Sequence, residues 1–249
     1  MPTLHQWLRS APFTLSMSAG FFSFFAHCGM VSLLEEEGLF PVQITGASAG
    51  ALVGACWAAG CSSAVLKERL FSLTREDFWD PGLGLGLLRG ERFRDVLREL
   101  CDDALLEDGR FPVGLSVTDM RSWSPHVLRS GRLAEAVSAS CAVPLLFQPV
   151  RIGRRYFLDG GLKDRHGLAG VASGERVFYH HIASRSPWRR KRSTALALPA
   201  RDNLVSLTIH GLPRSGPSRL EAGRAAFEQA RSAMRLALEE EIEGNRVEV

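Results

Sequence analysis

The segment Gly46-Ala47-Ser48-Ala49-Gly50 places a serine between two glycines, directly after the strand-like run Val42-Gln43-Ile44-Thr45. A G-x-S-x-G sequence in this position is typical of a nucleophile elbow, where glycines permit a sharp strand-to-helix turn that exposes the serine oxygen. The small-residue segment 51–60 predicts the helix that follows, and its N-terminus would direct partial positive charge at Ser48. Ser48 is therefore a candidate nucleophile, although a Gly/Ala-rich turn before a buried helix would have the same pattern.

A second candidate element is Leu158-Asp159-Gly160-Gly161, which follows a predicted hairpin centred on Gly153. An aspartate at the end of a strand, followed by two glycines, places a carboxylate on an exposed and tightly turned backbone. Such a carboxylate can accept the proton of a serine hydroxyl as a general base. Taken alone, the same three residues are also consistent with an ordinary Asp-Gly turn.

Strand-like and helix-like segments alternate along the chain, which predicts an α/β fold with a mostly parallel central sheet. The expected strands are 13–17, 42–45, 111–118, 150–152, 156–158, 177–182 and 204–209. The expected helices are 24–37, 51–60, 63–73, 91–101, 133–140 and an amphipathic C-terminal helix over 218–243.

Composition indicates one globular domain over residues 1–249, with 45% hydrophobic and 23% charged residues. A net charge of +3 does not indicate a nucleic-acid partner. The five cysteines lie in apolar surroundings without zinc-binding spacing, so we expect reduced thiols, no metal site and a cytoplasmic location. The apolar stretch 11–34 is interrupted by serines and His27, which favours a strand, a turn and a helix over a signal peptide or a membrane span.

The serine and aspartate motifs and the sequence around them resemble the patatin-like phospholipase family over residues 13–162. The matching segments are Ala26-His27-Cys28-Gly29-Met30 with Leu33-Leu34-Glu35-Glu36, then Val117-Thr118-Asp119, then 133–144 before the aspartate hairpin. They occur in the family's order, and together they are much more specific than either short motif.

The resemblance implies a three-layer α/β/α fold and a Ser–Asp catalytic dyad that works without histidine. It implies hydrolysis of carboxylic esters of phospholipids or acylglycerols through an acyl-enzyme, with no metal or organic cofactor. Ser48 takes the position of the nucleophile and Asp159 that of the base. The motif glycines are Gly46, Gly50, Gly160 and Gly161.

The first loop departs from the family pattern, in which a run of glycines, a basic residue and another glycine supply the oxyanion hole. Here the loop spans 18–25 with Gly20 as its one glycine, and Ser23 and Phe24 occupy the positions of the basic residue and the later glycine. We expect the backbone of Gly20 and Phe21, with Ala49 at the helix N-terminus, to bind the oxyanion. Of the four phenylalanines at 21, 22, 24 and 25, we expect two in the core and one or two facing the pocket.

Two segments are candidates for contact with a lipid surface. The apolar stretch 82–88 is either a plain linker or a lid that touches the membrane. The basic stretch 185–192, which includes Trp188, is either a solvated loop or a contact for phospholipid phosphates. Contact through either would make the protein peripheral at membranes or lipid surfaces.

Two other functions remain open at this stage. The altered first loop is consistent with a weak or inactive member that binds lipid or a protein partner. The chain order also allows a Ser-Asp-His triad, with the histidine drawn from His166, His180, His181 or His210. After the aspartate motif, Asp164 is either a second carboxylate near the site or a surface charge.

Overall fold

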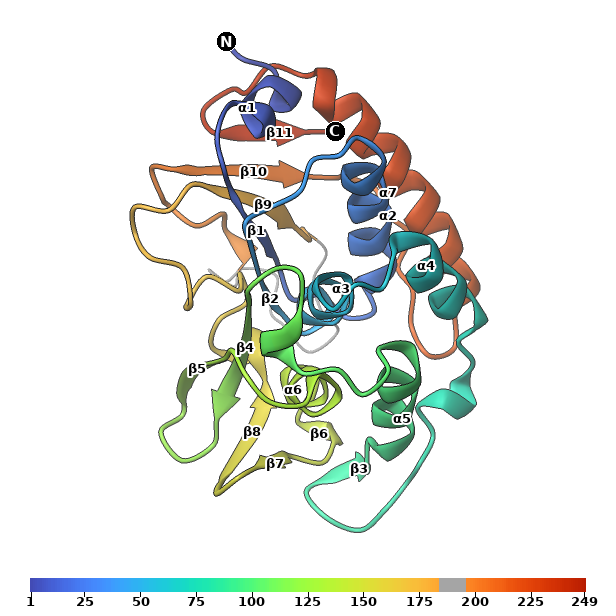
Figure 1. Ribbon diagram of the computed structural model, residues 1–249. Helices are drawn as coiled ribbons and strands as arrows, with labels where there is room; N and C mark the ends of the chain where they lie inside the picture. Colours follow the sequence, from blue (N-terminus) through green and yellow to red (C-terminus); the bar gives the residue numbers. More distant parts are fainter. Residues whose placement is uncertain (184–195) are drawn as a thin grey trace.

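The computed structural model describes residues 1–183 and 196–249, and its framework is a nine-stranded sheet. The strands along the sheet follow the order β11-β10-β9-β1-β2-β4-β8-β7, with β5 paired to β4 (Figure 1). Their bounds are β1 Thr14–Met17, β2 Gln43–Ala47, β4 Val113–Asp119, β5 Ser124–Leu128, β7 Val150–Ile152, β8 Arg155–Asp159, β9 Val177–His181, β10 Leu204–Thr208 and β11 Arg246–Glu248.

The centre of the sheet is parallel and one edge is antiparallel. Parallel pairing runs from β11 through β10, β9, β1 and β2 to β4, whereas β5, β8 and β7 pair antiparallel. The segments that follow β1 and β2 therefore leave the sheet at the same edge, where ligands bind in open α/β sheets. The antiparallel pairing of β8 with β4 places Asp159 opposite Val117.

Helices cover one face of the sheet (Figure 1). Their bounds are α1 Leu4–Ser10, α2 Phe24–Glu36, α3 Ala49–Ala58, α4 Ser63–Ser72, α5 Glu91–Leu100, α6 Leu133–Ser140 and α7 Glu221–Glu239. Helices α2 and α3 are buried almost all round, since α2 lies against α3, α4 and α7, and α3 lies on the sheet. Their Gly/Ala-rich and apolar sequences allow this close packing, and the main hydrophobic core lies between them and the strands.

The opposite face of the sheet carries a second, smaller apolar cluster. Successive residues of a strand point to opposite faces, so Phe178 of β9 joins the main core while Val177 and Tyr179 pack with Val171 and Leu204 on the other side. In the described part of the chain, connecting segments cover this face. The fold is thus α/β with a central, mostly parallel sheet, as the sequence predicts.

The structure contains several elements that the sequence pattern did not predict. Strand β5, helix α1 and strand β11 all lie outside the strands and helices that the sequence predicts. The expected loop 82–88 ends in β3 (Gly86–Leu88), which pairs in parallel with β6 (Leu145–Phe147) in a separate two-stranded sheet. Such short strands form because a neighbouring strand supplies hydrogen bonds, and their own sequences hold little signal.

The apolar stretch 11–34 divides as expected into β1, a turn at Gly20 and α2. None of the helices in the described part of the chain combines the length and apolar character that crossing a bilayer requires.

Candidate active site

Ser48 lies at the turn between β2 and α3, in a strained backbone conformation. Its φ of 52° and ψ of −116° are rare for a residue with a side chain. A Cβ on Gly50, one residue into α3, would collide with the Met17 carbonyl of β1. Because only glycine fits there, the first turn of α3 packs directly against the sheet and the serine is presented at its edge, as in a nucleophile elbow.

Ser140, at the end of α6, holds this turn in place. The backbone N–H of Ser48 donates to Ser140 Oγ over 2.9 Å, and the Ser140 hydroxyl donates to the Ser116 carbonyl of β4 over 2.7 Å. The hydroxyl is buried and links three elements that are far apart in sequence. Nothing in the local sequence distinguishes Ser140 from Ser138 two residues earlier, so only the tertiary structure identifies it.

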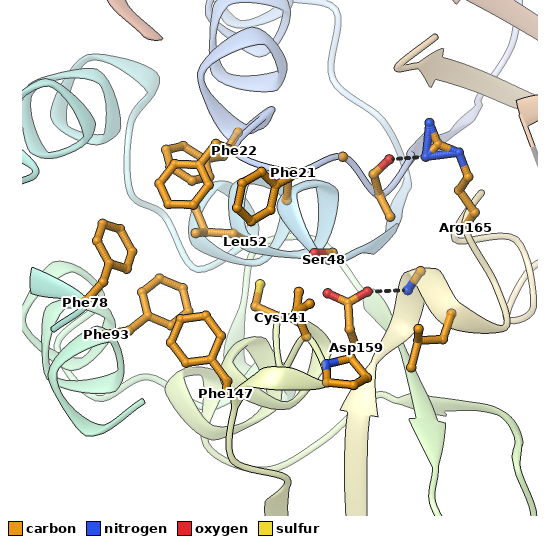
Figure 2. Close-up of a pocket in the computed structure, with 18 residues that line it drawn as sticks. Phe21, Phe22, Ser48, Leu52, Phe78, Phe93, Cys141, Phe147, Asp159 and Arg165 are labelled. Carbon is orange, nitrogen blue, oxygen red and sulfur yellow. Dashed lines mark hydrogen bonds between the residues drawn. The ribbon is translucent and has the colours of Figure 1, made fainter. Parts of the chain in front are cut away.

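Asp159 ends β8 and its carboxylate faces Ser48 across the pocket (Figure 2). The side chain is buried, and its Oδ1 accepts a hydrogen bond from the Gly161 N–H at 2.8 Å. The Asp159 backbone N–H donates to the Ala142 carbonyl at 2.9 Å. A Cβ on Gly160 would overlap the Ser116 carbonyl. The two glycines after Asp159 thus have separate roles. Gly160 permits close approach to β4, and Gly161 orients the carboxylate.

Cys141 is a second nucleophilic side chain in the same pocket. It contacts the Ser48 side chain and lies near the Asp159 carboxylate. Burial, and then the negative charge of Asp159, raise the pKa of the Cys141 thiol far above its usual range. Since the thiolate is the reactive form of cysteine, Cys141 remains an unreactive thiol beside the serine.

The three residues expected to form the oxyanion hole lie together at the pocket. Gly20, Phe21 and Ala49 line it with Ser48, so the loop after β1 and the first residue of α3 approach the serine from two sides. Phe22 has a φ of 55°, in the left-handed region that non-glycine residues rarely adopt. The loop thus reaches the pocket in a strained conformation, with Gly20 as its single glycine.

Phenylalanine rings form a continuous wall of the pocket. Phe22 contacts Phe78, Phe78 stacks on Phe93, and Phe93 contacts Phe147, with ring centres 5.5, 5.7 and 6.4 Å apart (Figure 2). Phe24 and Phe25 are buried. Phe21, Phe22 and Phe24 all line the pocket, whereas Phe25 packs in the core, so the loop supplies more pocket surface than we expected.

Arg165 is a site residue that the sequence analysis did not single out. Its guanidinium is buried and donates from Nη1 to the Ala19 carbonyl at 2.8 Å and from Nη2 to the Ile182 carbonyl at 2.5 Å. The Ala19 N–H donates in return to the Arg165 carbonyl at 2.7 Å. Arg165 therefore ties the residue before Gly20 to the end of β9, and it also lines the pocket. Its only sequence signal is a charge shortly after the aspartate motif.

Asp164 is neither a pocket carboxylate nor a free surface charge. Its carboxylate accepts hydrogen bonds from Ser116 Oγ at 2.5 Å and from the N–H groups of Leu168 and Ala169 at 3.1 and 2.8 Å. It anchors the segment that crosses the second face of the sheet. The two interpretations offered by the sequence are both replaced by this structural role.

None of the seven histidines, all of which fall in the described residues, lines the pocket. Tyr179 OH lies 2.6 Å from His166 Nδ1 and 3.1 Å from His181 Nδ1. His180 is 2.9 Å from His27, and His210 is 3.2 Å from the Glu248 carboxylate. Each histidine considered for a triad has its ring partner outside the pocket.

Buried histidines behind the first loop should make the fold sensitive to acid. Burial lowers the pKa of His27 and of His181 to about 4, from an ordinary value of 6.5, and lowers that of His180 well below 6.5. Below pH 6.5 these histidines become protonated in the unfolded chain but stay neutral in the folded chain. The free energy of unfolding therefore falls as the pH drops toward 4.

We expect the free energy of unfolding to fall by about 1.4 kcal/mol per pH unit for each such histidine. Urea unfolding between pH 7.5 and 5 measures this slope. His27→Gln should make the slope shallower, because one of the three buried histidines is then absent. An equal slope in wild type and His27→Gln would contradict the assignment.

Two other expectations concern groups away from the pocket. The basic stretch 185–192 lies outside the described residues. Within the described residues, no group of three or more His, Cys, Asp or Glu side chains is arranged to hold a metal ion.

Comparison with known proteins shows which family and which relatives the sequence of this chain matches. The family model described as "Patatin-like phospholipase" matches residues 15–171. An uncharacterized NTE family protein of Mycobacterium tuberculosis is 30% identical over 161 residues, which cover 64% of this chain and 45% of the relative. Neuropathy target esterase of Drosophila persimilis is 25% identical over 167 residues, covering 64% of this chain and 12% of that protein. The matched region is thus less than half of either relative.

A solved structure supports the same fold. The crystal structure of VipD from Legionella pneumophila aligns with a TM-score of 0.65 at 16% identity, over 91% of this chain and 66% of that chain. At this identity the likeness concerns the fold alone.

Proposed function

This chain belongs to the patatin-like phospholipase family, and from that premise we propose that it hydrolyses carboxylic esters of phospholipids or acylglycerols with a Ser48–Asp159 dyad. The observation that carries the proposal is the pocket itself. A serine on a strained strand-to-helix turn faces a buried carboxylate, and phenylalanine rings line the space beside them. No histidine lies in that pocket among the described residues.

In the proposed reaction, Ser48 Oγ attacks the ester carbonyl while Asp159 accepts the hydroxyl proton. Negative charge forms on the carbonyl oxygen, and the N–H groups of Gly20, Phe21 and Ala49 bind it. Asp159 then gives its proton to the departing alcohol, which leaves Ser48 acylated. A water molecule, deprotonated by Asp159, releases the fatty acid and restores the serine.

The substrate class follows from the apolar wall of the pocket. The rings of Phe22, Phe78, Phe93 and Phe147 form a surface that fits an acyl chain, and polar groups gather only near Ser48. Apolar pockets with a few convergent polar groups are typical of ligand sites. We also propose that the protein is peripheral at a lipid surface and contacts it through 82–88, as the position of that segment supports. For 185–192, membrane contact remains an expectation from sequence.

A fluorophosphonate probe tests the nucleophile directly. We expect stoichiometric labelling of the wild-type chain, with peptide mapping that places the adduct on Ser48. Prior incubation with a p-nitrophenyl acyl ester should slow the labelling, and a chain-length series of these esters should show turnover that increases when the chain is long enough to reach the phenylalanine wall.

The outcomes separate the proposed enzyme from its alternatives. An adduct on any serine other than Ser48, such as the neighbouring Ser140, would refute the assignment. A folded protein that takes no label and hydrolyses no ester, yet binds phospholipid, would instead be the lipid-binding member that the altered first loop allows.

A further inference from the structure

Four leucines project from the small sheet beside the pocket, and we name them the leucine ridge: Leu83, Leu85, Leu87 and Leu145. Their side chains are 104, 69, 51 and 82% exposed, in that order. The first two belong to the turn before β3, the third lies in β3, and the fourth begins β6. Pairing of Gly86 with Leu145 brings the two segments together. Scattered exposed leucines need no explanation, but four in two paired segments make this small sheet a candidate interaction site.

The ridge is held in position by ordered structure. Gln148 accepts a hydrogen bond from the Leu85 N–H at 3.1 Å and donates to the Leu83 and Gly86 carbonyls at 3.1 and 2.9 Å. One amide side chain thus satisfies three backbone groups of the turn. The leucines are therefore held out in solvent by a preformed loop, which lowers the entropy lost when they become buried.

Leu145 is exposed on a strained backbone. Its φ of 66° lies in the left-handed region, where glycine is favoured and a leucine is strained. Backbone strain of this kind persists only where the surrounding structure maintains it, and it concentrates at functional sites. Here it holds an apolar side chain in water directly after Val143 and Pro144, which line the pocket.

The ridge is continuous with the pocket. Strand β6 begins at the exposed Leu145 and ends at Phe147, which belongs to the phenylalanine wall. An apolar phase in contact with the ridge would therefore lie next to Val143, Pro144 and Phe147, which line the pocket. This arrangement suits an acyl chain that leaves a lipid layer and enters the site without crossing water.

Cations flank the ridge on both sides. One surface hollow contains Leu83 with Arg89 and Arg151, and another contains Leu85 with Arg121 and Arg154. The acidic side chains in these hollows are engaged by other arginines, since Glu91 pairs with Arg94 and Asp119 with Arg155. Among the described residues, no ion pair involves the four flanking arginines. The exposed leucines are suited to the acyl layer of an anionic bilayer, and the arginines that form no ion pair are suited to its phosphate layer.

We propose that the leucine ridge inserts into the acyl layer of an anionic phospholipid membrane while the flanking arginines bind its phosphates, so that the pocket opens onto the lipid. The inference rests on the proposed function for the identity of the substrate. The binding itself does not require catalysis, so the two can be tested separately.

Vesicle flotation tests the proposal. Wild-type protein should float with vesicles of phosphatidylcholine containing about one-third phosphatidylglycerol, and less with pure phosphatidylcholine, because each arginine near an anionic surface contributes about fivefold in affinity. Leu83→Ser/Leu85→Ser should reduce partitioning about 10²- to 10⁴-fold, the scale of burying two leucines. Arg89→Gln/Arg151→Gln should lose mainly the preference for anionic lipid.

Matched controls come from the same chain. Leu236 is 60% exposed on α7, far from the pocket, and Leu236→Ser should bind vesicles as wild type does. Arg246→Gln, on the distant edge strand β11, is the control for the arginines. All four variants should hydrolyse a water-soluble short-chain ester at the wild-type rate, because none of the changed residues lines the pocket.

The possible results distinguish this proposal from the proposed function. Wild type that hydrolyses soluble ester but does not float, or that floats equally well with and without the two leucines, would overturn the membrane proposal and leave the hydrolase intact. If the protein floats in a ridge-dependent way but has no esterase activity, the membrane proposal is supported and the proposed hydrolase function is overturned. A wild-type dimer that Leu83→Ser/Leu85→Ser converts to a monomer, with no vesicle binding, would show that a second copy covers the ridge and would also overturn the proposal.

Discussion

Ser48→Ala is expected to abolish acyl-ester hydrolysis, with a fall in kcat of about 10⁵- to 10⁶-fold, as when the nucleophile of a serine hydrolase is removed. The other nucleophile in the pocket, Cys141, cannot substitute, because burial and Asp159 raise the pKa of its thiol. The fold should be unaffected, since the bond from this turn to Ser140 uses the Ser48 backbone N–H. Ester hydrolysis and thermal unfolding of purified variants measure the two effects.

The companion change, Asp159→Asn, should lower kcat by about 10²- to 10⁴-fold, the usual contribution of a general base. An amide keeps the oxygen that accepts from Gly161 N–H but cannot take the Ser48 proton. Labelling of Ser48 by the fluorophosphonate should slow by a similar factor.

The controls for the dyad lie in the same pocket and in the histidines. Cys141→Ala should remain active. His166→Gln and His210→Gln should keep most of the wild-type kcat, because their ring partners are Tyr179 and Glu248. A histidine variant as inactive as Asp159→Asn would indicate a triad, and full activity of Ser48→Ala would remove the serine from the mechanism.

Arg165→Met is expected to lower kcat by about 10²- to 10³-fold with little change in KM, on the scale of losing one oxyanion donor. The guanidinium holds the Ala19 carbonyl, and the next residue is Gly20. Without the guanidinium, the loop can turn its N–H groups away from the oxyanion. The transition state then loses stabilisation, so kcat falls. Two buried carbonyls also lose their donor, at a cost of about 1–3 kcal/mol each in stability.

Arg176 is the matched control for Arg165. It also donates to two backbone carbonyls, those of Trp7 and Ala11, but at the opposite end of β1 from the pocket. Arg176→Met should destabilise the protein without lowering the kcat of the folded fraction. Arg165→Lys, which keeps the charge and one hydrogen bond, should recover part of the activity. If Arg165→Met and Arg176→Met reduce stability alike and leave kcat unchanged, Arg165 has only a structural role.

Where the backbone geometry of the candidate site is local, the sequence alone predicted it. The turn that exposes Ser48 depends on glycines within two residues of it, and the carboxylate of Asp159 depends on the two glycines that follow. The alternation of apolar strands and small-residue helices likewise predicted the parallel α/β sheet, because period and composition record which faces are buried. The family resemblance rests on these same local motifs and is confirmed by the family model.

Contacts between distant segments were decided only by the tertiary structure. Ser140 and Arg165 each hold the backbone of a segment more than 90 residues away, and an ordinary serine or arginine in sequence gives no sign of such a partner. Leu145 joins the leucine ridge through the pairing of β6 with β3, and Gln148 holds the turn that carries Leu83 and Leu85; no local pattern predicts either contact. The sequence by itself therefore determined the family, the main strands and helices, and the two candidate catalytic residues. The three-dimensional packing determined what holds them in place and which residues line the pocket beside them, because hydrogen bonds to backbone carbonyls depend on geometry and not on the identity of the residue that provides them.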